Sequence, residues 1–82
     1  MNPGDLLGRI TIDPKVMVGK PVIKGTRLTV EYILGLLASG LTIEEVLDEY
    51  PGLKKDDVLA CLLFASKTLE DSSFVPSKIE AI

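Results

Sequence analysis

Apolar and polar residues follow two different patterns on the two sides of residue 29. Before it, short apolar runs separated by Gly and Pro are typical of strands and turns. After it, apolar residues recur every three or four positions, which is typical of amphipathic helices. The pattern predicts a small β segment over residues 9–28, three helices over residues 29–69 and a tail over residues 70–82.

The β segment is organised around residues 19–28, which read Gly-Lys-Pro-Val-Ile-Lys-Gly-Thr-Arg-Leu. Its Val-Ile pair favours a strand, because β-branched side chains pack well on a pleated surface. Lys24-Gly25 predicts a two-residue turn, since Gly accepts the positive φ that tight hairpins require. We therefore predict a β-hairpin in which Thr26–Leu28 pairs back onto Pro21–Ile23.

The residues before this hairpin predict one further strand. Arg9–Ile12 alternates between polar and apolar positions, and Asp13-Pro14 ends the alternation. Residues 1–8, with a Pro and two Gly, predict a flexible lead-in. A sheet of two or three strands is marginal alone, so we expect it to pack on the helices and to pair with a second copy in a homodimer.

The first two predicted helices carry local start and stop signals. Thr29 is the expected N-cap of a helix over about Val30–Ser39, which Gly40 ends in a left-handed conformation. Thr42–Glu45 has the sequence of a capping box, in which the Thr hydroxyl and the Glu carboxylate each bind the other residue's backbone N–H. The second helix ends at Tyr50, because a residue before Pro disfavours the α conformation.

The third predicted helix, about Lys55–Leu69, has so broad an apolar surface that we expect it to be the central one. Asp56 and Asp57 lie in its first turn, where negative charge interacts favourably with the helix dipole. The single cysteine, Cys61, is interpreted as a small buried hydrophobe, with a reactive thiol as the alternative.

The length and composition predict one domain, residues 1–82, with a single small core. The apolar share of 46% is high for this size, so we expect a partner or a second copy to cover part of the surface. No apolar run approaches the ~18 residues of a membrane span. We find no signal peptide at the N-terminus and expect a cytoplasmic protein.

The chemistry available to the chain argues against catalysis. The sequence contains no His, which removes the commonest general base and a common metal ligand. The alternative is a pair of carboxylates, but Glu44 and Asp48 are i,i+4 neighbours on one solvated helix face without a partner base. We therefore expect no catalytic, metal-binding or cofactor-binding residues, and a protein that is not an enzyme.

Charge is unevenly distributed along the chain. Residues 1–30 carry five basic and two acidic residues, whereas residues 31–82 carry four basic and ten acidic residues. If nucleic acid is bound, the β-rich third is the better electrostatic candidate. The alternative is that its lysines keep an exposed strand edge soluble. The candidate nucleic-acid-binding residues are Lys20, Lys24, Arg27, Lys54 and Lys55.

Four motifs carry a resemblance to a known family. They are Ile12-Asp13-Pro14, Gly19–Arg27, Gly40–Val46 and Tyr50–Leu53, and they occur in one order along residues 10–66. This arrangement resembles the domain of unknown function 433 family, small bacterial and archaeal proteins similar to VapB-type antitoxins. The resemblance implies a short β segment followed by a three-helix, homeodomain-like helix-turn-helix core. It also implies a PIN-like nuclease toxin as the partner.

Two functional hypotheses follow. The first is an antitoxin-like module that binds and neutralises such a toxin and also binds its own operator DNA. Its partner-binding residues would be Phe74 and Val75 in the apolar tail. The second is a DNA-binding transcriptional regulator that acts alone through a helix-turn-helix core and the basic residues named above.

Overall fold

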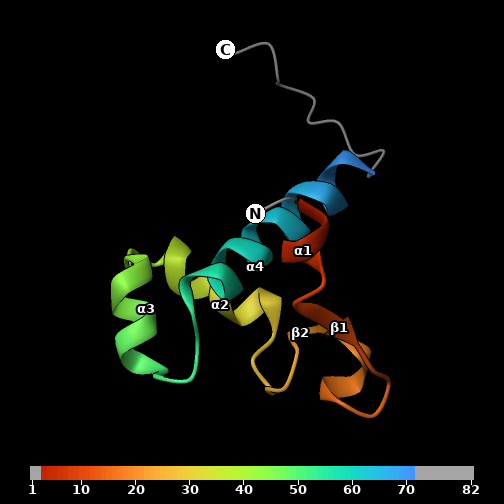
Figure 1. The fold of residues 1–82 in the computed structure, drawn as a ribbon, viewed down its shortest axis with the longest axis horizontal. Helices are drawn as coiled ribbons and strands as arrows, with labels where there is room; N and C mark the ends of the chain where they lie inside the picture. Colours follow the sequence, from red (N-terminus) through yellow and green to blue (C-terminus); the bar gives the residue numbers. More distant parts are fainter. Residues whose placement is uncertain (1–2, 72–82) are drawn as a thin grey trace.

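The structure of the protein is a computed structural model that describes residues 3–71. It is mainly helical, with one two-stranded antiparallel sheet near the N-terminus (Figure 1), and this confirms the predicted fold class. In chain order the elements are α1 (Pro3–Leu7), β1 (Ile10–Ile12), the 3-10 helix η1 (Met17–Gly19), β2 (Pro21–Ile23), α2 (Val30–Ala38), α3 (Ile43–Glu49) and α4 (Lys55–Glu70).

Local signals set the ends of α2 and α3, as predicted. The Thr29 hydroxyl accepts a 3.0 Å hydrogen bond from the backbone N–H of Tyr32 in the first turn of α2. At α3, Thr42 Oγ1 accepts from the N–H of Glu45 at 3.1 Å, and Glu45 Oε1 accepts from the N–H of Thr42 at 2.8 Å. Gly40 follows α2 with φ +109°, the left-handed position that Gly occupies without strain.

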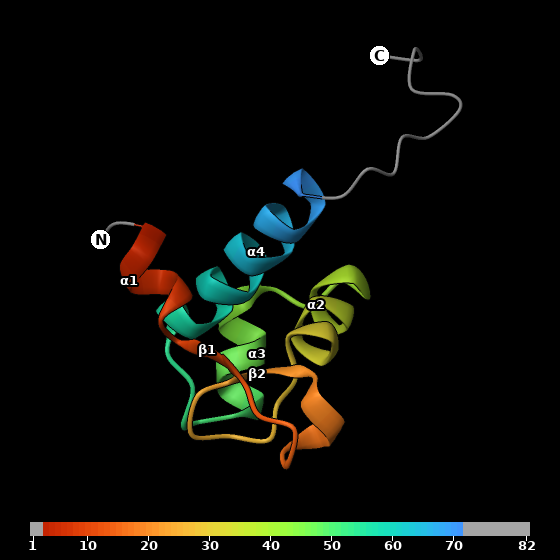
Figure 2. The same ribbon diagram turned by 90° about the vertical axis from the view of Figure 1, so that its right-hand side faces the viewer.

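Helix α4 is the central element, as predicted. It packs against α1, α2, α3 and β1, and the two views show α1 and α2 on its two sides (Figures 1 and 2). Its first half faces the core, but Leu62 and Leu69 are 42% and 70% exposed. The broad apolar surface of α4 is therefore only partly buried in the described region. The core side chains, which come from β2, α2, α3 and α4, include Ile23, Ile33, Val46, Val58 and Cys61.

The strand partner of β2 differs from the predicted hairpin. β2 pairs antiparallel with β1, so that Ile10 lies opposite Ile23 and Ile12 opposite Pro21. Thr26–Leu28 is not a strand, and only a single bridge joins the residue after it, Thr29, to β2. The strand over residues 10–12 is confirmed, and the predicted return strand is wrong.

The turn at Lys24-Gly25 explains this difference. The N–H of Thr26 donates to the carbonyl of Ile23 at 3.0 Å, which closes a β-turn, and Gly25 has φ +83°. Among residues 3–71 only Met17 and Val18 are non-glycine residues with positive φ, so Lys24 keeps an ordinary conformation. Positive φ only at the third turn position is typical of a type II turn, whose twist does not suit a tight hairpin.

The N-terminal residues also differ from their prediction as a flexible lead-in. Residues 3–7 form α1, which packs along α4, and Gly8 donates its N–H to the carbonyl of Gly4 at 3.1 Å. The residues that pack are Leu6 and Leu7, which are half-buried. Sequence reasoning gave weight to the Gly and Pro residues and overlooked this pair of leucines.

Candidate functional site

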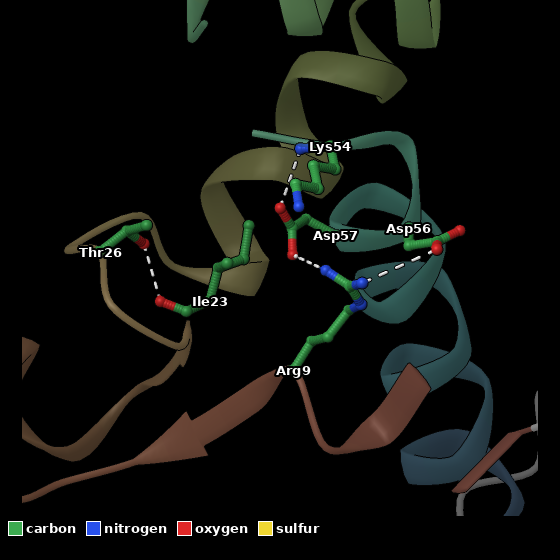
Figure 3. Close-up of polar contacts among 6 residues, drawn as sticks. All are labelled: Arg9, Ile23, Thr26, Lys54, Asp56 and Asp57. Atoms are coloured by element: carbon green, nitrogen blue, oxygen red, sulfur yellow. Dashed lines mark hydrogen bonds and ion pairs between the residues drawn. The ribbon is translucent and has the colours of Figure 1, made fainter. Parts of the chain in front are cut away.

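An ion pair joins the β segment to the start of α4 (Figure 3). Arg9 lies just before β1, and its Nη1 donates to Asp57 Oδ1 at 2.9 Å, while Nη2 lies 3.7 Å from Asp56 Oδ2. The second oxygen of Asp57 accepts the backbone N–H of Lys54 at 2.9 Å. One carboxylate therefore both caps α4 and binds Arg9, and it does so at a residue that is only 8% exposed.

Sequence reasoning missed this ion pair. It placed Asp56 and Asp57 in the first turn of α4 for their interaction with the helix dipole, and it assigned no partner to Arg9. A partial signal exists, because Asp57 is three residues after Lys54, a residue whose side chain cannot accept the N–H of the first turn. Nothing near Arg9 in the sequence points to a residue 48 positions away.

A shallow groove of about 420 Å³ lies between the turn after β2 and the loop that joins α3 to α4. Arg9 connects the two sides of the groove. Its carbonyl accepts the N–H of Lys24 at 2.8 Å, at the start of the turn after β2, and its guanidinium binds Asp57 at the start of α4. The residues that line the groove are Gly25, Thr26, Leu28, Glu49, Tyr50, Pro51, Gly52 and Leu53.

Three of the five predicted nucleic-acid-binding residues, Lys24, Arg27 and Lys54, are next in the sequence to residues that line this groove, which we call the basic groove. Lys24 and Arg27 are in its first loop, and Lys54-Lys55 follows the second loop directly. All four side chains are exposed, and none forms an ion pair with a carboxylate of residues 3–71. Lys20 is placed elsewhere, with its Nζ 3.1 Å from Oε1 of Glu31 on α2. The basic groove thus lies between two loops that each carry or precede exposed basic residues.

Tyr50, which lines this groove, contacts Tyr32 of α2. The hydroxyls of Tyr32 and Tyr50 are 2.5 Å apart, and the rings meet edge to face with their centroids 6.1 Å apart. The hydrogen bond with Tyr32 raises the pKa of Tyr50, because it holds the phenol in its neutral form. The phenol of Tyr50 is therefore uncharged at neutral pH, and the two rings offer aromatic faces and edges for contact with a partner.

A second groove, of about 330 Å³, runs between α2 and the C-terminal half of α4. Its walls are almost entirely apolar, and its far end is Leu69, which is 70% exposed. The predicted partner-binding residues, Phe74 and Val75, lie outside the described residues. The residues that line this groove, which we call the α2/α4 groove, are Pro21, Val30, Glu31, Leu34, Phe64, Ala65, Thr68 and Leu69.

Cys61 is a buried residue of the core, as predicted. Burial raises the pKa of its thiol to about 11, with a smaller contribution from the charge of Asp57. The thiol is therefore protonated and unreactive at neutral pH. Within residues 3–71 no three His, Cys, Asp or Glu side chains are grouped as metal ligands would be. In the same part of the chain, no helix has the length and apolarity needed to cross a membrane.

These features describe a small, mainly helical domain whose two-stranded sheet is joined to its central helix by an ion pair and whose surface carries shallow grooves. The chain belongs to the family described as "Protein of unknown function (DUF433)", whose sequence profile matches residues 10–65. The matched region spans both strands, α2, α3 and most of α4, which confirms the resemblance carried by the four motifs.

Three known proteins are similar to this chain. The crystal structure of a DUF433 member protein from Anabaena variabilis superposes with a TM-score of 0.73 and 30% identity, over 82% of this chain and 66% of that one. An uncharacterized protein, y4eO, from Sinorhizobium fredii is 29% identical over 56 residues, which are 68% of this chain and 25% of the relative. An uncharacterized protein from Archaeoglobus fulgidus is 70% identical over 23 residues, 28% of this chain and 64% of the relative.

Proposed function

We propose that the chain is an antitoxin-like binding module that holds a PIN-like nuclease toxin inactive in the cytoplasm. The resemblance to VapB-type antitoxins motivates this role. In it the chain acts by occupying a surface of its partner, so it needs no catalytic residue of its own.

The observation that carries the proposal is the α2/α4 groove. Its lining is almost entirely apolar and is exposed at Leu69, so it offers apolar surface that a partner could bury. It ends at Leu69, five residues before Phe74 in the sequence. We propose that an apolar segment of the toxin occupies this groove and that Phe74 and Val75 add to the contact.

The test is co-expression with the product of the adjacent gene, followed by purification through a tag on the present chain. A stable complex with a nuclease-like neighbour is expected, and Leu69→Asp should reduce the recovered partner at least tenfold, since it places a charge in the groove. Val18→Asp is the matched control, because Val18 is 92% exposed and lies on η1, outside the groove. The proposal is overturned if the neighbour does not bind, and the groove is excluded if Leu69→Asp binds as well as the control.

A second function is favoured by the basic groove. Lys24, Arg27 and Lys54-Lys55 would contact phosphates from two loops that the Arg9–Asp57 ion pair holds in place. In this role the chain is a DNA-binding regulator, either alone or as the complex with the toxin.

The DNA-binding role is tested by fluorescence anisotropy with the DNA upstream of the gene, at about 50 mM and about 200 mM salt. Replacing Lys54 and Lys55 by Ala should lower the salt slope by about two, one for each lost phosphate contact. Lys15→Ala, an exposed lysine away from the groove, should leave the slope unchanged. Absence of binding at about 50 mM salt would exclude this role.

A further inference from the structure

The outer edge of β1 has no hydrogen-bonding partner in the described part of the chain. The N–H of Lys24 donates to the carbonyl of Arg9 at 2.8 Å, which makes Arg9 and Thr11 the residues that bond to the β2 side. Ile10 and Ile12 therefore direct their N–H and C=O groups away from β2. No residue among 3–71 bonds to them there, and the sheet of the described region has only the two strands β1 and β2 (Figure 1).

This edge is short, and the charges and Pro that usually protect strand edges lie only at its ends, at Arg9 and Asp13-Pro14. Within the strand itself, Ile12 has 58% of its surface exposed. A shallow groove of about 460 Å³ lies beside the strand, between it and the C-terminal half of α4. The residues that line this groove, which we call the β1 groove, are Leu7, Ile10, Thr11, Ile12, Phe64, Lys67, Thr68 and Asp71.

We propose that β1 pairs with β1 of a second copy of this chain, antiparallel about a two-fold axis at Thr11, to form a four-stranded sheet. Ile10 of each copy then lies opposite Ile12 of the other. Each of these two pairs exchanges two backbone hydrogen bonds, so all four outward-facing groups of each strand are satisfied.

The sequence around β1 selects this register among the symmetric ones. An axis at Ile12 would place Ile10 opposite Pro14, which has no N–H to donate. An axis at Ile10 would place Ile12 opposite Gly8, whose own N–H already donates to the carbonyl of Gly4. An axis at Thr11 leaves the outward-facing isoleucines to pair with each other.

The side chains are complementary in the same register. Ile12 of the second copy projects on the same face as Ile10, and it therefore enters the β1 groove beside Phe64. At the ends of the paired strands, Arg9 of one copy lies opposite Asp13 of the other, so no like charges meet across the pair. An exposed isoleucine, a vacant edge and an adjacent groove are thus explained by one partner.

Sedimentation equilibrium of the full chain alone tests the interface, independently of any toxin. At about 100 μM, in the affinity range of a modest interface, the wild type should be dimeric. Ile12→Lys should shift it to the monomer, because the lysine would enter the β1 groove of the partner. Leu62→Lys makes the same change on an exposed leucine about 200° around α4 from Phe64, and it should stay dimeric. A monomeric wild type, or a dimeric Ile12→Lys variant, overturns the proposal.

Disulfide trapping tests the register. Thr11 meets its own copy in a non-hydrogen-bonded pair, where Cα atoms are about 4.5 Å apart and a disulfide fits. Thr11→Cys should form a cross-linked dimer on mild oxidation, while Cys61 stays reduced because it is fully buried. Asp13→Cys is the control, since the two copies of residue 13 lie about 13 Å apart along the strands. Equal cross-linking of both variants, or of neither, overturns the register.

Discussion

The β segment and the helices differ in how far apart in the sequence their stabilising partners lie. Thr29 and Thr42 each cap a helix through a residue three positions ahead. In the β segment, β1 pairs with a strand that begins nine residues after it ends, and Arg9 binds a residue 48 positions away. The helices can therefore begin to form from local signals, whereas the β segment acquires its structure only when the core brings distant residues together.

The two regions nevertheless share one core. Ile23 of β2 is 2% exposed and belongs to the same buried cluster as Ile33 of α2. If the β segment only covered the surface of the helices, Ile23 would be partly exposed to solvent. The two regions thus differ in whether local or distant contacts determine their structure, but both are stabilised by the same core. Paired substitutions can test each of these two points.

The largest effects are expected for matched truncations in the core. Ile33→Ala and Ile23→Ala should each lower the free energy of unfolding by about 3 kcal/mol, since both remove a buried aliphatic side chain and leave a cavity. Urea unfolding followed by circular dichroism gives both values in one experiment. A loss below about 1 kcal/mol for Ile23→Ala alone would mean that the β segment is a separate unit and not part of the core.

The ion pair between the regions comes next. Asp57→Ala should cost about 2–3 kcal/mol, because it leaves the part-buried Arg9 without its partner and the N–H of Lys54 without an acceptor. Asp56→Ala makes the same change one residue earlier, on a more exposed carboxylate 3.7 Å from Arg9, and should cost less than about 0.5 kcal/mol. Equal losses for the two variants would show that charge near Arg9 matters and the buried geometry does not.

This difference between the regions also explains what could be predicted from the sequence. The caps at Thr29 and Thr42 and the Gly40 terminus are encoded within a few residues, so the limits of α2 and α3 were recognisable. The Lys24-Gly25 turn was recognisable too, but its type depends on the φ of Lys24, which the sequence leaves open. The wrong turn type led to the wrong partner for β2.

The candidate site could be predicted only in part, for the same reason. The exposed basic residues were identified because Lys and Arg are rarely buried. Their gathering around one groove depends on Arg9 and Asp57, and no spacing rule joins residues so far apart. The α2/α4 groove was hidden for another reason, since the apolar surface of α4 is equally compatible with full burial. In the described region, Leu69 at the end of this groove is 70% exposed.

A smaller loss of stability is expected when the local capping box of α3 is removed. Thr42→Ala removes one half of the capping box and should cost about 1 kcal/mol. Glu44→Ala, in the same helix turn but outside the box, should cost less than about 0.5 kcal/mol. Because the box is local, helical content of a peptide over residues 40–50 should also fall for the first variant and not for the second. An unchanged peptide would contradict the view that α3 is locally specified.

The smallest effect concerns the connection between the two strands. Val18 has φ +56° and is 92% exposed, so a β-branched residue holds a left-handed conformation without any packing in return within residues 3–71. Val18→Asn should raise the free energy of unfolding by about 0.5 kcal/mol, because Asn tolerates this conformation better. Val16→Asn is the matched control, since Val16 has an extended backbone and is half-buried, and it should destabilise. If Val18→Asn is neutral or destabilising, the strain at η1 is smaller than its backbone suggests. The pairing of β1 with β2 would then determine the conformation of η1, so that distant contacts would determine this part of the β segment as well.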